Sequence, residues 1–319
     1  GKTGVCLVTS GPGATNLVTG IATANYDSVP LVCFTGQVPM NLIGNDAFQE
    51  VDIVGITRSI CKYAVTVRKR EDLARIIKNA FYIARTGKPG PVVVDIPKDI
   101  QLAMGSDEYP AEVNIRGYKP SEGVHVGQIK RALAELKNAK KPVFLCGGGV
   151  NIAHARKEMQ QLAEKTGIPV VTTIMGKGAI PTDHPLYVGN IGMHGNLASN
   201  KAIMESDVLL SIGCRFNDRI TGTIDTFAKN AKIIHVDIDA ASISRNIKVD
   251  IPIVADAKVA ISKMLEYAEP LDIKDWVDDI MNVKAEYPIN MNRYDGVTPE
   301  AIIRTINDMY SNLIITTDV

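Results

Sequence analysis

The chain has 319 residues, of which 45% are hydrophobic and 22% charged, as in an ordinary globular enzyme with more than one domain. Lysine plus arginine balance aspartate plus glutamate at 35 each, so net charge favours neither nucleic acid nor an anionic membrane as a partner. No apolar run reaches the roughly 18 residues of a membrane span, no secretory leader is visible, and the five cysteines have no C-x-x-C spacing, so we expect a cytoplasmic protein without structural zinc.

Short apolar segments alternate with helical patterns, which predicts an α/β fold with parallel sheets flanked by helices. The first block should hold strands over residues 5–9, 31–35 and 92–96 and a helix after Arg70. The second block should hold strands over residues 143–146, 170–173, 208–212 and 233–238, with helices after Val126, Ala155 and Asp256. A last helix should begin at Pro299, capped by Thr298, and lead into a strand over residues 313–317.

These blocks predict the domain organisation. We expect domains over residues 1–105 and 124–268, linkers over 106–123 and 269–297, and the start of a third domain over 298–319. The chain has no starting methionine, and its last predicted strand lacks the loop and helix that should follow it. We therefore expect a piece of a longer enzyme.

The most informative segment is Gly213–Gly222, which follows the apolar run Val208–Ile212. Such a run predicts a buried parallel strand. The glycine, two arginines and Asn-Asp pair that follow it lie where open α/β sheets bind ligands. A surface loop with solvated charges is the alternative for this segment alone.

Other predicted strands of the second block also end in small or polar residues. These ends are Gly147–Gly149, Thr173–Gly176, Ile191–Gly195 and Asp237–Asp239. Each loop alone can be a tight turn, and none has the G-x-G-x-x-G spacing. Several such ends together predict an elongated ligand along the sheet edge, for which a flavin or nicotinamide dinucleotide has a suitable shape.

In the first block, Phe48 and Gln49 follow the loop Thr35–Pro39. A glutamine can stabilise an oxyanion without adding charge, and Phe48 can form an apolar wall beside it. The alternative from spacing alone is that Phe48 is a core residue and Gln49 caps the following helix.

Six motifs resemble, in this order, the catalytic large subunit of acetohydroxyacid synthase (acetolactate synthase), a thiamin-diphosphate-dependent enzyme family. They are Ser10–Asn16, Thr35–Pro39, Ala47–Glu50, Gly90–Pro97, Met193–Gly195 and Arg215–Gly222. The resemblance covers the whole chain. It implies that residues 1–105 are the C-terminal part of a thiamin pyrimidine-binding domain, 124–268 a central FAD-binding domain and 298–319 the start of a diphosphate-binding domain.

The resemblance also implies a function. The parent enzyme would condense pyruvate with pyruvate or 2-ketobutyrate, with decarboxylation, in branched-chain amino acid biosynthesis. The implied cofactors are thiamin diphosphate, FAD and Mg²⁺, and the implied partners are a second copy in a homodimer and a regulatory small subunit. The family's thiamin-activating glutamate and metal motif are not found within residues 1–319, so we expect this chain alone to be inactive. A pyruvate-oxidase-like redox flavoenzyme and a non-enzymatic nucleotide-binding module are the alternatives.

Site residues follow from the same resemblance, position by position. Phe48 and Gln49 match catalytic positions, and Pro39 and Lys62 match positions in the substrate channel. Arg116 is the candidate for a flavin-contacting arginine near the linker. No metal ligand is expected. The positions that match FAD contacts are Gly147, Gly148, Thr173, Ile174, Ile191, Gly192, Met193, His194, Gly213, Arg215, Asp218, Asp237 and Asp256.

Overall fold

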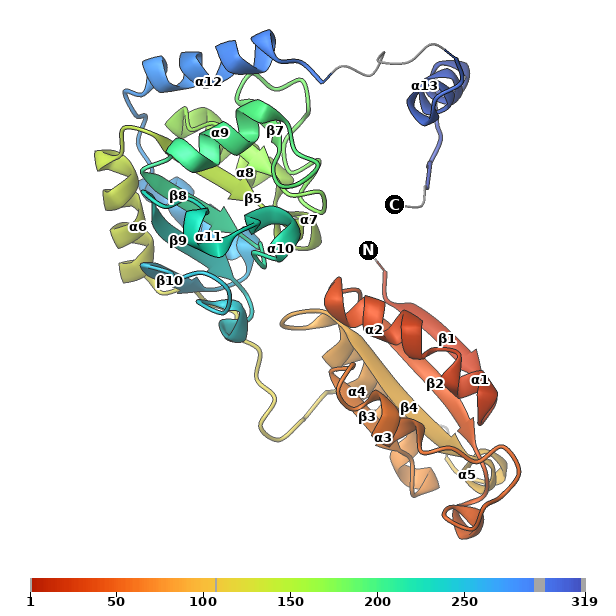
Figure 1. The fold of residues 1–319 in the computed structure, drawn as a ribbon. Helices are drawn as coiled ribbons and strands as arrows, with labels where there is room; N and C mark the ends of the chain where they lie inside the picture. Colours follow the sequence, from red (N-terminus) through yellow and green to blue (C-terminus); the bar gives the residue numbers. More distant parts are fainter. Residues whose placement is uncertain (1, 107, 290–295, 317–319) are drawn as a thin grey trace.

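The computed structural model describes residues 2–106, 108–289 and 296–316. Within these ranges lie two parallel β-sheets, each flanked by helices and joined by a segment without regular structure (Figure 1). The α/β fold class predicted from the sequence is confirmed. No helix of the described ranges is both long and apolar enough to cross a membrane.

The first sheet has four parallel strands in the order β1-β2-β4-β3. Helix α4 covers one face, because Ile76, Ala80 and Ile83 recur at helical spacing and are buried there. Ile21 of α2 packs on the other face. The strands are β1 (Gly4–Val8), β2 (Leu31–Gln37), β3 (Tyr63–Thr66) and β4 (Pro91–Pro97). The helices are α1 (Pro12–Thr15), α2 (Val18–Tyr26), η1 (Met40–Leu42), α3 (Ile53–Thr57), η2 (Arg70–Asp72), α4 (Leu73–Arg85) and α5 (Lys98–Leu102).

The second sheet has six parallel strands in the order β10-β9-β8-β5-β6-β7. They are β5 (Pro142–Cys146), β6 (Val170–Thr172), β7 (Tyr187–Asn190), β8 (Val208–Ile212), β9 (Lys232–Asp237) and β10 (Ile251–Val254). The central strands β5 and β8 are buried at every residue, as expected for continuous apolar runs covered on both faces.

Helices surround the second sheet, and the chain winds in both directions from β5. Strands β6 and β7 follow on one side, and β8, β9 and β10 on the other, so the topological switch point lies between β5 and β8. The helices are α6 (Val126–Asn138), α7 (Gly148–Ile152), α8 (Arg156–Thr166), α9 (Leu197–Glu205), α10 (Asp218–Thr221), η3 (Ile224–Thr226), η4 (Ala240–Ser242) and α11 (Ala257–Tyr267).

The structure differs from the sequence-based expectations towards the C-terminus. Residues 269–297, expected as a linker, contain helix α12 (Lys274–Glu286). Its Trp276 and Ile280, four residues apart, are buried against the second sheet, and Trp276 Nε1 donates a hydrogen bond to Pro142 O at 3.1 Å. The helix α13 (Pro299–Met309) begins at Pro299 after the Thr298 cap, as predicted. Residues 313–316 are not in a strand, and residue 317 of that expected strand lies outside the described ranges.

Candidate functional site

The carboxyl ends of all six strands in the second sheet lie along one edge, and a residue predicted to bind the dinucleotide follows each of them. Since neighbouring parallel strands are spaced about 4.8 Å apart, this edge is about 24 Å long. In sheet order the residues are Asp256 after β10, Asp237 at the end of β9, Gly213 and Arg215 after β8, Gly147 and Gly148 after β5, Thr173 and Ile174 after β6, and Ile191, Gly192, Met193 and His194 after β7. The structure therefore brings residues far apart in sequence into a single row.

Glycines at the switch point allow the backbones after β5 and β8 to touch. Gly147 N donates to Ile212 O at 2.9 Å, and Gly149 N donates to Gly213 O at 3.1 Å. A Cβ on Gly147 would lie 2.1 Å from Gly213 O, which no fold tolerates without movement. At Gly148 the nearest obstacle is the Met175 side chain at 3.1 Å. Gly147 is therefore required for packing, whereas a Cβ at Gly148 would make one tight contact, with Met175.

Large apolar side chains project into solvent along this otherwise polar edge. Ile174 is 73% exposed and Met193 is 64% exposed, and Met175 and His194 are also exposed. The residues that precede the first two, Thr173 and Gly192, are held by the fold, since Thr173 N donates to Cys146 O at 3.0 Å and Gly192 N to Asn200 Oδ1 at 2.9 Å. Exposed apolar side chains on rigid supports are typical of walls for a flat ring system.

The end of β9 carries a buried carboxyl group, Asp237. Its Oδ1 accepts a hydrogen bond from Asp239 N at 2.8 Å, and its Oδ2 lies 3.7 Å from His235 Nε2. Burial raises the pKa of Asp237 to about 6, because the charged form loses hydration. For the same reason the pKa of the fully buried His235 is lowered to about 4. A partly desolvated carboxylate at a strand end is suited to accept a ribose hydroxyl.

Arg215 points from the second sheet towards the first. Its Nη1 donates to Tyr26 O at the end of α2, and its Nη2 lies 3.6 Å from Asp27 Oδ1. Two other predicted residues are placed less centrally. Asp218 is exposed at the start of α10, and Asp256 is the N-cap of α11, accepting from Lys258 N at 2.8 Å and Val259 N at 3.2 Å. The Asp256 carboxylate therefore has a structural role.

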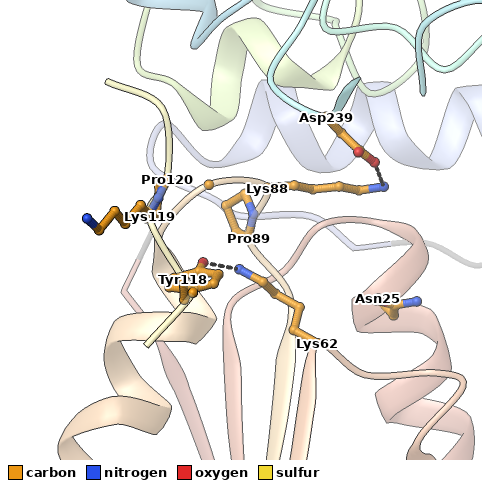
Figure 2. Close-up of a pocket in the computed structure, with 10 residues that line it drawn as sticks. Asn25, Lys62, Lys88, Pro89, Tyr118, Lys119, Pro120 and Asp239 are labelled. Carbon is orange, nitrogen blue, oxygen red and sulfur yellow. Dashed lines mark hydrogen bonds and ion pairs between the residues drawn. The ribbon is translucent and has the colours of Figure 1, made fainter. Parts of the chain in front are cut away.

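A cavity of about 450 Å³ lies between the two sheets, next to the end of β9. Figure 2 shows Lys88 reaching across it to Asp239, with Nζ and Oδ2 3.3 Å apart. Its lining residues are Asn25, Lys62, Gly87, Lys88, Pro89, Gly117, Tyr118, Lys119, Pro120 and Asp239. Three lysines against one aspartate give this cavity a positive charge.

The structure does not bring Lys62 together with Pro39. Pro39 follows the carboxyl end of β2, but Lys62 precedes β3 and so lies at the opposite edge of the parallel sheet. Lys62 Nζ donates to Ile83 O and to Thr86 O at 2.7 Å. It also donates to Tyr118 OH at 3.1 Å, as Figure 2 shows. Burial lowers the pKa of Lys62 to about 8. It thus lines the cavity between the sheets, whereas Lys98 directly follows β4 and so shares the carboxyl edge with Pro39.

The carboxyl edge of the first sheet presents Phe48 and Gln49. Phe48 is 88% exposed, and the cap of α3 is Asp52, which accepts from Gly55 N at 2.8 Å. The alternative that Phe48 is core and Gln49 a helix cap is therefore wrong. Gln49 has a left-handed φ of 59°, uncommon outside glycine. A Cβ on Gly11 would lie 2.7 Å from Gln49 O, so only glycine in the Ser10–Asn16 loop permits this contact.

A buried polar network holds the loop after Gln49. Gln37 Nε2 donates to Val51 O at 2.9 Å and to Asp95 Oδ2 at 3.3 Å. Asp95 also accepts from Thr35 Oγ1 at 2.8 Å and Thr66 Oγ1 at 3.2 Å. Burial raises the pKa of Asp95, and these three donors oppose that shift. The network ties strands β2, β3 and β4 to the segment that carries Gln49.

Sequence reasoning missed the cationic side of the site. Lys88 and Lys119 lie in loops that have no distinctive spacing, whereas the candidate Arg116 is exposed and does not line the cavity. The Gly-Lys-Pro-Gly run at residues 87–90, just before a strand, was the available signal. In the described part of the chain, no group of three or more His, Cys, Asp or Glu residues is arranged to hold a metal ion.

Comparison with known families identifies both sheets. Residues 129–264 match the model "Thiamine pyrophosphate enzyme, central domain", and residues 1–56 match "Thiamine pyrophosphate enzyme, N-terminal TPP binding domain". The chain belongs to the thiamine pyrophosphate enzyme family. The strands of the second sheet lie within the residues that match the central domain of this family, and the Ser10–Asn16 loop and Gln49 fall within those that match its N-terminal domain.

Several curated relatives of the chain are acetolactate synthase large subunits. The chain is 47% identical over 342 residues to a probable acetolactate synthase large subunit of Methanococcus aeolicus, covering 100% of the chain and 57% of that relative. It is 48% identical over 334 residues to the corresponding protein of Methanocaldococcus jannaschii, covering 100% and 56%. The acetolactate synthase large subunit of Corynebacterium glutamicum is 47% identical over 314 residues, covering 96% and 50%.

These relatives confirm the resemblance seen in the sequence motifs. The chain spans about half the length of the curated relatives that it matches.

Proposed function

We propose that the protein is an acetolactate synthase large subunit that condenses two 2-keto acids, pyruvate with pyruvate or 2-ketobutyrate, with loss of carbon dioxide. The relatives at 47–48% identity support this activity. The redox alternative is not favoured, because these relatives are synthases. The proposed units are residues 1–105 for the pyrimidine side, 124–268 for the central domain and 298–319 for the start of the diphosphate side.

The central domain would bind FAD along the carboxyl edge of the second sheet. The observation that carries this proposal is the row of six strand ends, with tightly packed glycines at the switch point. Asp237 would accept a ribose hydroxyl, and the Gly148 amide, whose neighbours Gly147 N and Gly149 N are already bonded to Ile212 O and Gly213 O, would face the pyrophosphate. Ile174 and Met193 would contact the flat rings. Lys88 would add positive charge at the end of this row nearest Asp239.

The first sheet would contribute one wall of the thiamin site. Thiamin diphosphate, when bound, supplies the electron sink for decarboxylation and carbon–carbon bond formation. The Gln49 amide would hold a substrate oxygen, and the exposed Phe48 ring would exclude water beside it. Lys98 would serve in place of Lys62 as the cation beside Pro39. Mg²⁺ would be held with the diphosphate, and we propose a homodimer and a regulatory small subunit as partners.

Flavin retention tests the central part of the proposal. The 319-residue chain would be incubated with FAD or with NAD, passed through a desalting column and assayed for bound nucleotide. We expect retention of FAD and not of NAD. Binding of NAD alone, or of neither nucleotide, would contradict the assignment.

The reaction is tested separately. In the full-length protein, acetolactate formation from pyruvate should require thiamin diphosphate and Mg²⁺ and should leave the flavin oxidised, whereas the 319-residue chain alone should form no acetolactate. Flavin bleaching during pyruvate turnover would instead support the oxidase alternative.

A further inference from the structure

The loop Gly213–Phe216, which carries Arg215, has an unusual backbone. Gly213 has a φ of 63° and Phe216 a φ of 51°, so two of its four residues are left-handed. For a side chain as large as phenylalanine this conformation is strained, and it persists only where the surroundings impose it. The loop therefore depends on contacts from outside itself.

Asn246 supplies one set of these contacts. Its Nδ2 donates to Arg215 O and to Phe216 O, both at 3.0 Å. Asn246 lies between η4 and β10, about 30 residues further along the chain. A single NH₂ group has two protons, so both are used to hold consecutive carbonyl groups of the loop.

His235 of β9 supplies the second set from beneath the loop. Its Nε2 lies 2.9 Å from Cys214 O. A carbonyl oxygen only accepts, so Nε2 carries the proton and donates it. The imidazole also meets the Phe216 ring edge-on, with centroids 5.0 Å apart and planes at 77°. The side chain is fully buried, so these contacts cannot be exchanged for water.

Together the two side chains hold three consecutive carbonyl groups, those of Cys214, Arg215 and Phe216. This fixes the direction in which the Arg215 side chain leaves the sheet edge, towards Tyr26 O and Asp27, which follow the cavity-lining Asn25. We propose that Asn246 and His235 are positioning residues for the dinucleotide site, acting through the Gly213–Phe216 loop. The proposal rests on the proposed function of this edge as the FAD site.

The test measures two quantities in variants of the 319-residue chain, namely the affinity for FAD and the rate of hydrogen–deuterium exchange in the Gly213–Phe216 loop. Asn246→Ala removes the two loop hydrogen bonds at an exposed position. The matched control is Asn138→Ala, which removes a 2.9 Å bond from an exposed asparagine to Ala134 O at the end of α6. We expect Asn246→Ala to weaken FAD binding about tenfold and to speed hydrogen–deuterium exchange in peptides covering 213–220, with neither change in the control.

His235 is tested by a pair of variants. His235→Leu leaves Cys214 O without its donor and should weaken FAD binding at least as much as Asn246→Ala. His235→Gln places an amide donor near the former Nε2 position and should restore most of the affinity, which a role in core filling alone would not predict.

The outcomes separate this proposal from the proposed function. If the wild-type chain retains no FAD, the FAD assignment fails, and loop exchange alone decides whether these side chains hold the loop. Unchanged exchange in Asn246→Ala would overturn the positioning role. The positioning role would also be overturned if exchange in Asn246→Ala became faster while FAD affinity stayed unchanged, because the loop would then not position the ligand.

Discussion

Lys88 Nζ and Asp239 Oδ2 lie 3.3 Å apart and join the loop after α4 to the end of β9, across the boundary between the two sheets. Both side chains are about one-third exposed, so the pair contributes less than about 1 kcal/mol to stability. The pair lies at the positive cavity next to the end of β9, where the proposed FAD site would begin.

Lys88→Ala should therefore weaken FAD binding about tenfold while leaving the melting temperature nearly unchanged, since a charge-assisted contact to a phosphate would be lost. Isothermal titration and thermal unfolding would measure the two quantities. Lys137→Ala is the control, because Lys137 pairs with Glu269 at 2.7 Å near the amino edge of the second sheet. Equal affinities for the two variants would rule out a contact between Lys88 and the nucleotide.

Substitutions of the two glycines at the switch point should have different effects, since Gly147 is needed for packing and Gly148 is proposed to face the ligand. Gly147→Ala places a Cβ 2.1 Å from Gly213 O, so we expect a loss of at least about 2 kcal/mol in the free energy of unfolding. Gly148→Ala places a Cβ 3.1 Å from Met175 Cβ, a tight contact that a small shift relieves, so it should cost less stability than Gly147→Ala, yet bind FAD more weakly because the methyl group lies beside the Gly148 amide. Urea unfolding and FAD titration of both variants check this. A folded Gly148→Ala with wild-type affinity would show that the pyrophosphate lies elsewhere.

The sequence was sufficient to predict that the strand ends of the second sheet share one edge, but not where the cavity lies. Strand ends follow from continuous apolar runs such as β5 and β8, and parallel pairing then places their loops on one edge. The position of Lys62 relative to Pro39 was not predictable, because a residue before a strand and one after a strand look alike in a motif, although they lie at opposite edges. Lys88 and Asp239 meet only through tertiary packing, which no local pattern encodes.

Phe48 should be dispensable for folding. Its ring is 88% exposed, so Phe48→Ala should change the free energy of unfolding by less than about 0.5 kcal/mol. Phe144→Ala, which truncates a fully buried ring of β5, should cost about 3–5 kcal/mol. Urea denaturation of both variants measures the contrast. A loss of 2 kcal/mol or more for Phe48→Ala would mean that the ring packs in a way inconsistent with a wall of an open site.

Asp237 and His235 should impose opposite pH dependences on stability. The pKa of Asp237 is raised from 3.8 to about 6, so its stabilising contribution is full below pH 3.8 and is lost as pH rises through 6. The pKa of His235 is lowered from 6.5 to about 4, so its contribution is full above pH 6.5 and is lost as pH falls through 4. Each shift of about 2 units corresponds to roughly 3 kcal/mol, so the two largely cancel between pH 4 and 6 in the wild-type chain.

A variant that lacks one of the two ionisable groups shows the pH dependence of stability that the other group imposes. Asp237→Asn keeps the acceptor for Asp239 N but cannot ionise, so its stability relative to wild type should fall as pH is lowered from 7 to 4. His235→Gln cannot be protonated, so its relative stability should rise over the same range. Urea unfolding at half-unit pH steps would measure both difference curves. Curves with the same slope would mean that these two groups are not buried together at the end of β9, and the ribose contact assigned to Asp237 would lose its physical basis.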